Sequence, residues 1–215
     1  MRPKQQHVYP HDPRSDVSPH VPPARVVVDV GCGTGGFGLS LRTRLGEDAV
    51  IYGIDVVPEN VAESGTLGAY DLVVGGYYPD DVPTHWERPD LICFLDVLEH
   101  MVEPWDALRA ARDHLGPGGR VLASVPNIQY WPAVSDLLKG RWDYTETGIL
   151  DRTHLRFFTR STLIEAFEQA GFQVDLCRGI NSCLQEPGKY TRYRRIRRFR
   201  PDMEWLQFVV VATAR

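Results

Sequence analysis

An acidic residue followed by a run of glycines is the part of this sequence best suited to holding a ligand. Asp29 comes directly after three valines, and the loop behind it is almost free of side chains. Four glycines occupy this loop: Gly31, Gly33, Gly35 and Gly36. Glycine adopts positive φ angles easily and lets another molecule lie against bare backbone. Residues 26–38 therefore predict a strand, a glycine turn and the start of a helix, whose free N–H groups point at the same ligand.

The charge of Asp29 indicates which ligand this turn holds. The spacing of Gly31, Gly33 and Gly36 satisfies GxGxxG, a pattern that two cofactor classes share. A carboxylate two residues before the turn repels a pyrophosphate, whereas it attracts the ammonium group of an amino acid. We therefore favour a cofactor with an amino-acid end over a nicotinamide dinucleotide.

Further polar side chains follow two other predicted strands. Asp55 ends the apolar run 50–56, about 20 residues beyond the glycines, where this kind of fold offers an acid to a ribose diol. The alternative for Asp55 is a residue that forms a turn at the end of its strand. Asp96, Glu99 and His100 follow the apolar run 91–95. Open α/β sheets bind ligands at the carboxyl ends of their strands, so these groups are expected to lie at the site.

Two histidines are placed to handle a proton. His100 follows the fourth predicted strand, and His154 lies beside Asp151 and Arg152. A neighbouring carboxylate orients an imidazole and raises its basicity. The candidates for catalysis are therefore His154, His100 and Asp151, and the alternative for each histidine is a loop residue satisfied by backbone hydrogen bonds.

The segment DVGCGTG, residues 29–35, resembles the first motif of class I S-adenosylmethionine-dependent methyltransferases, and LICFLDVLEH, residues 91–100, resembles the strand that passes the sulfonium in that family. The resemblance implies S-adenosylmethionine as the cofactor and S-adenosylhomocysteine as the product. It also implies that Asp29 binds the methionine amino group and that Asp55 binds the ribose. The cofactor-binding residues expected from it are Asp29, Gly31, Cys32, Gly33, Thr34, Gly35, Asp55, Val56, Leu95 and Asp96.

The order of the predicted elements supports the same family. We expect an α/β fold with a Rossmann-like, seven-stranded, mostly parallel sheet, helices on both faces and an antiparallel last strand. The final strands, 172–177 and 205–214, form a pair that suits a methyltransferase sheet better than a nicotinamide-binding one. The expected division is a proline-rich segment 1–23, mobile or acting as a lid with Tyr9 and Arg14, and a domain 24–215.

One strand departs from the family pattern. Many relatives carry an aspartate after the first glycine of the third strand, where it contacts adenine, but this chain has Gly76 followed by Tyr77 and Tyr78. Two alternatives remain open: a tyrosine ring stacks on adenine, or Asp80 or Asp81 reaches back to it.

Residues 128–158 break the helical and strand periodicity and are rich in aromatic groups, which is typical of a functional loop. We predict a substrate loop here, although buried aromatic residues also pack simply against one another. The candidate substrate-binding residues are Tyr130, Trp131, Trp142, Tyr144 and Arg152.

A second insertion, predicted at 179–203, contains six arginines: Arg192, Arg194, Arg195, Arg197, Arg198 and Arg200. Such a cluster repels itself, so an anion is expected nearby. The candidates are a phosphate-bearing substrate, acidic groups of this chain or of a partner, and anionic lipid; the alternative is a solvated loop.

Composition narrows the classes of protein. The 215 residues suit one domain, and a net charge of −4 argues against a nucleic-acid partner. No apolar run reaches the ~18 residues that a bilayer requires, so we expect a cytoplasmic protein without a membrane span. The four cysteines lack metal-ligand spacing, so neither a disulfide nor a metal is expected.

The predicted function is methyl transfer from S-adenosylmethionine to a small-molecule acceptor. The segment GILDRTHLRFFT, residues 148–159, resembles small-molecule methyltransferases associated with sugars and secondary metabolites, which favours a hydroxyl of such a compound. Alternatives are an N-methyltransferase or RNA methyltransferase of the same fold, a cofactor-binding protein without activity, and a nicotinamide oxidoreductase.

Overall fold

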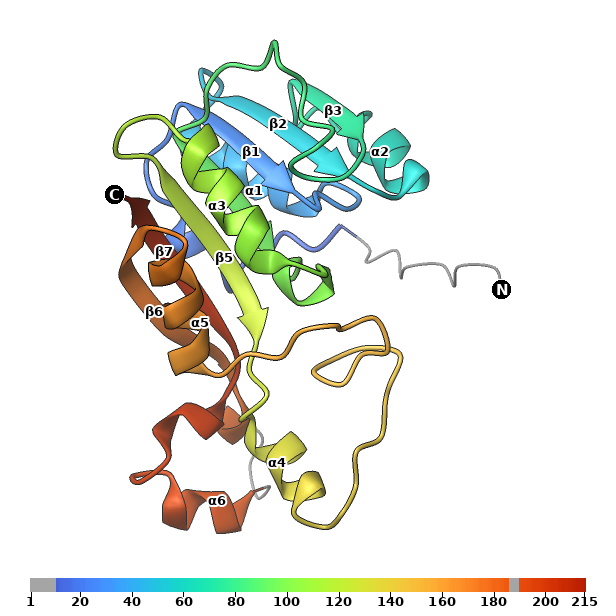
Figure 1. Cartoon of the computed structure of the whole chain (residues 1–215). Coiled ribbons are helices and arrows are strands. Elements are labelled where there is room, and N and C mark those ends of the chain that lie inside the picture. Colours follow the sequence, from blue (N-terminus) through green and yellow to red (C-terminus); the bar gives the residue numbers. More distant parts are fainter. Residues whose placement is uncertain (1–10, 186–189) are drawn as a thin grey trace.

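The computed structural model describes residues 11–185 and 190–215, which form a seven-stranded sheet in the order β3-β2-β1-β4-β5-β7-β6 (Figure 1). Strand β7 pairs antiparallel with β5 and β6, while the pairs among β1 to β5 are parallel. The strands are β1 Val26–Val30, β2 Val50–Asp55, β3 Leu72–Gly75, β4 Leu91–Leu95, β5 Arg120–Pro126, β6 Phe172–Ser182 and β7 Trp205–Ala214. This arrangement confirms the predicted Rossmann-like sheet with an antiparallel last strand.

Helices cover both faces of the sheet. They are α1 Gly36–Leu45, α2 Pro58–Ser64, α3 Pro104–His114, α4 Trp131–Leu137, α5 Arg160–Gln169 and α6 Thr191–Ile196. Successive strand residues point to opposite faces, so Val27 and Val28 belong to different cores. Val28 packs in the core that contains Leu108 of α3 and Phe167 of α5, and Val27 in the core that contains Leu41 of α1. Burial of both faces explains why the parallel strands read as continuous apolar runs.

Residues 11–21, which we call the N-terminal strap, pack on the α1 side of the sheet. Val17 and Val21 are buried in the core on that side. The Arg44 guanidinium of α1 donates hydrogen bonds to the carbonyls of Val21 and Pro19 at 3.1 and 3.0 Å. Despite its prolines, this part of the predicted lid is attached to the domain, whereas Tyr9 lies outside the described residues.

The two predicted insertions contain more regular structure than the sequence indicates. The substrate loop 128–158 includes α4, and strand β6 continues to Ser182, so the arginine-rich insertion starts later than the predicted residue 179. That insertion contains α6 and the short 3-10 helices Cys183–Gln185 and Pro201–Glu204. Within the described part of the chain, no helix has the length and apolar character needed to cross a membrane.

Candidate active site

The glycine turn between β1 and α1 exposes its backbone to a ligand. Gly31, Gly33 and Gly35 have φ angles of 69°, 54° and 94°, values that side chains disfavour. The turn is held from below, because Gly31 N donates to the carbonyl of Ile54 in β2 at 2.8 Å. A Cβ added at Gly33 would meet nothing within 4 Å, so open space lies over this part of the turn. The arrangement therefore fits a cofactor that lies against backbone.

Asp55 fixes this turn to the loop after β2. One carboxylate oxygen accepts a hydrogen bond from Gly33 N at 2.9 Å, and the other accepts from Val57 N at 2.8 Å and from the Asn60 amide at 3.2 Å. Asp55 is thus a structural brace of the two loops. The contact of Asp55 with a ribose stays a prediction. The next residue, Val56, is 40% exposed.

Asp29 is buried beneath the turn and is paired with a tyrosine that sequence reasoning missed. The Tyr70 hydroxyl donates to Asp29 Oδ2 at 2.7 Å, and the tyrosine ring occupies the space that a Cβ at Gly38 would need. Burial, with a smaller contribution from Asp55, raises the pKa of Asp29 to about 7, while the Tyr70 hydrogen bond and Arg14 act in the opposite direction. Asp29 is therefore an acid whose charge depends on what binds next to it.

Asp96, at the end of β4, is the centre of a hydrogen-bond network. It takes a positive φ of 56°. Its Oδ2 accepts from Arg14 Nη1 at 2.7 Å, and its Oδ1 accepts from Ser124 Oγ at 3.0 Å and from Gln207 Nε2 at 2.7 Å. The network joins the strap to β4, β5 and β7, and no spacing in the sequence indicated Gln207.

The N-terminal strap crosses the glycine turn before it reaches Asp96. A Cβ at Gly36 would come within 2.5 Å of the backbone of Asp12, so the strap lies directly on the first residue of α1. Farther along, Asp16 accepts hydrogen bonds from Arg14 at 3.1 Å and from Asn181 of β6 at 2.9 Å. The strap thus lies on the end of the glycine turn, and its action as a lid stays a prediction.

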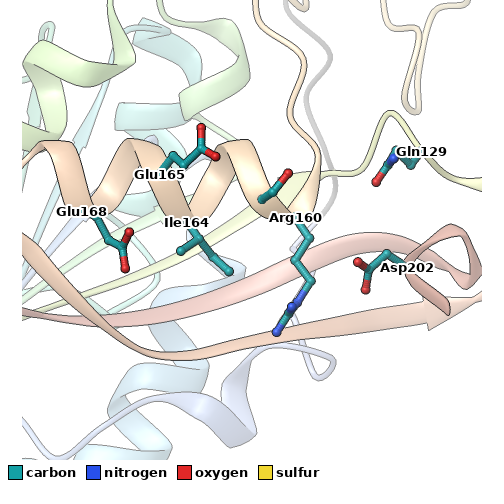
Figure 2. A pocket seen from close by; sticks show the side chains of 7 residues that line it. Gln129, Arg160, Ile164, Glu165, Glu168 and Asp202 are labelled. Atoms are coloured by element: carbon teal, nitrogen blue, oxygen red, sulfur yellow. The ribbon is translucent and has the colours of Figure 1, made fainter. Parts of the chain in front are cut away.

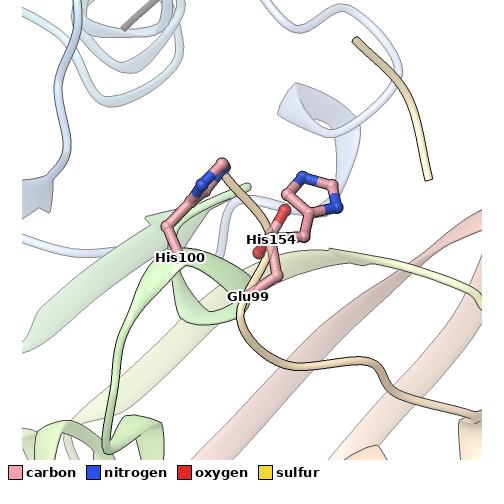
Figure 3. Close-up of side chains that lie close together, drawn as sticks. All are labelled: Glu99, His100 and His154. Atoms are coloured by element: carbon pink, nitrogen blue, oxygen red, sulfur yellow. The ribbon is translucent and has the colours of Figure 1, made fainter. Parts of the chain in front are cut away.

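Two of the candidate catalytic residues, His100 and His154, meet Glu99 beyond Asp96. Figure 3 shows the carboxylate of Glu99 next to the rings of His100 and His154. One ligand atom of each residue lies within 4.8 Å of the others, and the two ring centroids are 4.7 Å apart. Glu99 is 1% exposed, and neither carboxylate oxygen has a hydrogen-bond partner among the described residues. Burial, followed by repulsion from Asp96, raises the pKa of Glu99 well above its usual range.

Hydrogen bonds define which nitrogen of each ring is bare. His154 Nδ1 lies 2.9 Å from the Ile149 carbonyl, which only accepts, so Nδ1 carries the hydrogen. His100 Nδ1 lies 3.3 Å from the Thr153 carbonyl and 3.0 Å from Thr153 Oγ1, whose own hydrogen goes to Asp151 Oδ1 at 2.7 Å. In the neutral form of either ring, the lone pair is therefore on Nε2.

Asp151 consequently acts on a different histidine from the one predicted. Its carboxylate orients His100 through Thr153, while His154 takes its orientation from a backbone carbonyl. Burial alone would raise the pKa of Asp151. The hydrogen bonds from Thr153 and the charges of the two histidines outweigh burial, so the pKa of Asp151 is lowered. Burial and the neighbouring His154 lower the pKa of His100, which favours its neutral form.

The predicted substrate residues fall into separate places. Trp142 packs edge-on against Phe157, with centroids 5.7 Å apart, and Phe157 lies 6.5 Å from the His154 ring. Trp131 stacks on Tyr193 of α6 at 5.6 Å. Tyr144 is 48% exposed, Arg152 pairs with Glu146 at 2.9 Å, and Tyr130 precedes α4. Of the predicted aromatic residues, Trp142 is thus the one that reaches the histidine pair, and it does so through Phe157. The sequence analysis did not single out Phe157.

The residues after β3, where an adenine contact was predicted, differ in their exposure. Tyr78 is buried edge-on against Phe94, so it is a core residue. Tyr77 is 69% exposed, and its backbone N–H donates to Asp81 at 2.8 Å. Of the alternatives considered for this strand, an exposed Tyr77 ring remains available for stacking, whereas Asp81 is engaged with the turn.

The remaining predicted cofactor residues lie in the same region. Cys32 and Thr34 are buried in the turn, and Leu95 packs on the α1-side core. Cys93 is buried in β4, as expected for a small thiol in the sheet.

A pocket away from the turn contains none of these residues. Its volume is about 350 Å³, and Figure 2 shows side chains of α5 and Asp202 around it. It is lined by Gln129, Arg160, Ser161, Ile164, Glu165, Glu168 and Asp202. Its carboxylates and wide mouth offer no group suited to the predicted chemistry.

The described arginine side chains of the second insertion are exposed. They are Arg194, Arg195, Arg197, Arg198 and Arg200. None of these five forms an ion pair with a described residue, so the acidic groups of the resolved domain do not neutralise them.

Known proteins resemble this chain in sequence and in fold. A family model described as a methyltransferase domain matches residues 4–176. Two proteins named ubiquinone biosynthesis O-methyltransferase, from Hydrogenovibrio crunogenus and Cereibacter sphaeroides, are 28% and 32% identical over 73% and 67% of this chain. These matches span 66% and 59% of the two relatives, less than two thirds of either. A crystal structure from Thermotoga maritima, titled as an S-adenosylmethionine-dependent methyltransferase and possible histamine N-methyltransferase, has a TM-score of 0.65 at 16% identity and covers 95% of this chain and 88% of its own.

The contacts of Arg14 predict that it holds the strap closed. Replacement by alanine removes its bonds to Asp96, Asp16 and Ser124, so the amides of Val17 and Ser18, which donate to the Arg14 carbonyl, should exchange at least about tenfold faster. Hydrogen exchange with mass spectrometry measures this, with the exposed Arg25→Ala as the control. Unchanged exchange in Arg14→Ala would show that the strap does not depend on this side chain.

The raised pKa of Asp29 predicts a pH-dependent cost to stability. The fold favours its protonated form, so its contribution is fully present below about pH 4 and is lost as the pH rises through about 7. Relative to Asp29→Asn, which keeps an acceptor for Tyr70, the wild-type protein should lose on the order of a few kcal/mol of unfolding free energy across this range. Denaturant unfolding from pH 5 to pH 8 tests this, with exposed Asp48→Asn as the control; parallel curves for wild type and Asp29→Asn would contradict it.

Proposed function

Because this chain belongs to the class I S-adenosylmethionine-dependent methyltransferases, we propose that it transfers the cofactor's methyl group to a hydroxyl of a small acceptor, such as a sugar or a secondary metabolite. The observation that supports this proposal most strongly is that the glycine turn and the histidine cluster lie at the same edge of the sheet. Strands β1 and β4 are direct neighbours, so the acidic glycine turn and the Glu99, His100 and His154 cluster lie at their carboxyl ends.

The turn has the groups that the cofactor requires. Open backbone at Gly33 faces the amino-acid part, and Asp29 supplies a carboxylate for the ammonium group. The remaining lone pair of Asp55, on Oδ2, accepts a ribose hydroxyl. When bound, S-adenosylmethionine supplies a methyl group activated by the sulfonium charge, and S-adenosylhomocysteine remains after transfer.

The residues of this chain then act mainly by positioning. Alignment of reacting groups accounts for about 7–11 kcal/mol of a barrier when the geometry is correct. The strap closes the cofactor side of the site through Arg14. An acceptor hydroxyl must lose its proton as its oxygen gains the methyl group, and His100 and His154, each held through Nδ1, orient this hydroxyl and take part in removing the proton.

Oxygen is favoured as the acceptor atom for two reasons. The two relatives reported above are named O-methyltransferases, and an amine that is already unprotonated has less need of a group that removes a proton. Trp142 and Phe157 next to His154 provide aromatic faces on which a sugar or another ring packs.

The exposed arginines favour a second candidate, an RNA methyltransferase. Guanidinium groups without ion-pair partners are suited to phosphates. This candidate predicts RNA binding that weakens steeply with salt and that is lost when Arg194, Arg195 and Arg197 become alanine. RNA binding without salt dependence, or methyl transfer to small hydroxyl compounds alone, would reject it.

The primary proposal is tested by supplying methyl-labelled S-adenosylmethionine with a panel of sugars, dihydroxy aromatics, amines and RNA. The expected result is label on a hydroxyl of a sugar or another small compound, together with calorimetric binding of S-adenosylhomocysteine. Binding of NADH without binding of S-adenosylhomocysteine would reverse the cofactor assignment. Binding of S-adenosylhomocysteine with no transfer across the panel would favour a protein that binds the cofactor without using it.

His154→Ala separates chemistry from cofactor binding. Loss of the imidazole should lower turnover by roughly 10²–10⁴-fold and change the affinity for S-adenosylhomocysteine by less than about twofold. Steady-state kinetics and calorimetry give the two quantities, and the exposed His85→Ala is the matched control. Turnover equal to that of His85→Ala would remove His154 from the mechanism.

A further inference from the structure

We propose that Glu99, His100 and His154 together bind a divalent transition-metal cation, on which the acceptor hydroxyl is held and made acidic. The inference rests on the proposed function for the role of the cation, but the cation site itself stands on the geometry of three side chains. The proposal differs from the expectation from the sequence, in which no metal was expected. The sequence showed no metal-ligand spacing because His154 is far along the chain from Glu99 and His100.

The first argument is the unpartnered carboxylate. Glu99 is 1% exposed, and both of its oxygens lack a hydrogen-bond partner among the described residues. A buried polar group without a partner is costly, and buried carboxyl groups are normally hydrogen-bonded, paired or bound to metal. Asp96 and Asp151 act on Glu99 with the same sign of charge, and the guanidinium of Arg14, which acts with the opposite sign, is already bonded to Asp96 and Asp16. A cation between the carboxylate and the rings supplies the missing partner.

The second argument is the state of the two rings. Because Nδ1 of His154 donates to Ile149 and Nδ1 of His100 donates to Thr153, each Nε2 is a lone pair. The two lone pairs and the Glu99 carboxyl group therefore lie together, with a ligand atom from each of the three residues inside 4.8 Å of the others. A divalent cation that replaces the proton of the buried carboxyl group can bind all three ligand atoms at once.

The third argument is the support behind the rings. Histidines that bind a metal usually donate their other N–H to a carbonyl or a carboxylate, which fixes the tautomer and the ring direction. Here Ile149 supplies a carbonyl to His154, while Thr153, which is itself bonded to Asp151, supports His100. The backbone also locks the loop in place, since the N–H groups of Leu155 and Arg156 donate to the carbonyl of Glu99 at 2.8 and 3.0 Å. Both sides of the cluster are thus oriented before any ion binds.

The donor set decides the class of cation. Two imidazole nitrogens and one carboxylate suit zinc, cobalt or iron in the divalent state, whereas magnesium prefers oxygen ligands. Three protein ligands also leave a coordination position open, which is typical of a catalytic site and not of a structural one.

An open position at this place accounts for the removal of the acceptor's proton. Coordination to a divalent cation lowers the pKa of a bound hydroxyl, so its O–H bond breaks and the proton passes to solvent water. The oxygen keeps the electron pair and forms the new bond to the methyl carbon, while the pair of the broken carbon–sulfur bond returns to sulfur. No oxidant or reductant is consumed.

Titration of the chelator-treated full chain with cobalt(II) tests the site without cofactor or acceptor. We expect one cobalt per chain with visible absorption bands of a low-coordinate ion, and a higher unfolding temperature on binding. Glu99→Gln and His154→Ala should weaken cobalt binding by at least about 100-fold, in line with the loss of a ligand, while His85→Ala should bind like wild type. Magnesium at the same concentration should not compete.

Glu99→Gln also distinguishes loss of a ligand from loss of the fold. The amide has nearly the same volume as the unpartnered buried carboxyl group, so the unfolding temperature of the metal-free protein should be equal or higher. Wild-type protein that fails to bind cobalt, Glu99→Gln that binds it as tightly as wild type, or competition by magnesium would overturn the proposal. So would methyl transfer that proceeds equally with and without chelator, although the proposed function would then stand. Cobalt binding as expected without any binding of S-adenosylhomocysteine would support the cation site and reject the proposed function.

Discussion

The acidic groups at the carboxyl edge of the sheet are the constraint on which this structure depends. Asp29 is buried under the glycine turn, while Asp96, which is partly exposed, and the buried Glu99 follow the neighbouring strand β4. A carboxylate removed from water is costly unless a cation or strong donors accompany it. Asp96 has Arg14, Ser124 and Gln207, whereas Asp29 has the hydroxyl of Tyr70 and Glu99 has no described partner. The two acids with the weaker support are the ones that a positively charged ligand would satisfy.

This distribution of charge relates the strap to the site. Arg14 occupies the cationic position beside Asp96, and the same segment lies on the first residue of α1. The strap is attached through side chains at the end of β4 and on β5 and β6. The strap and these strands are therefore parts of one hydrogen-bond network.

The sequence predicted the sheet, the glycine turn and the position of Asp55, because strand periodicity and glycine spacing are local signals. The partners of these residues could not be predicted in the same way. Tyr70 reaches Asp29 across 41 positions and Gln207 reaches Asp96 across 111, so only the folded chain brings them together. The predicted pairing of Asp151 with His154 illustrates the limit: neighbours in sequence suggested one contact, and the turn directs the carboxylate to Thr153 and hence to His100.

The central claim is that Asp29 and its turn bind the amino-acid end of a sulfonium cofactor. The most direct measurement compares the calorimetric affinity of S-adenosylhomocysteine with that of 5′-methylthioadenosine, which keeps the nucleoside and sulfur but lacks the amino-acid group. The account predicts that S-adenosylhomocysteine binds at least about tenfold more tightly, since a charge-assisted hydrogen bond contributes roughly 1.5–3 kcal/mol. Equal affinities for the two compounds would contradict it.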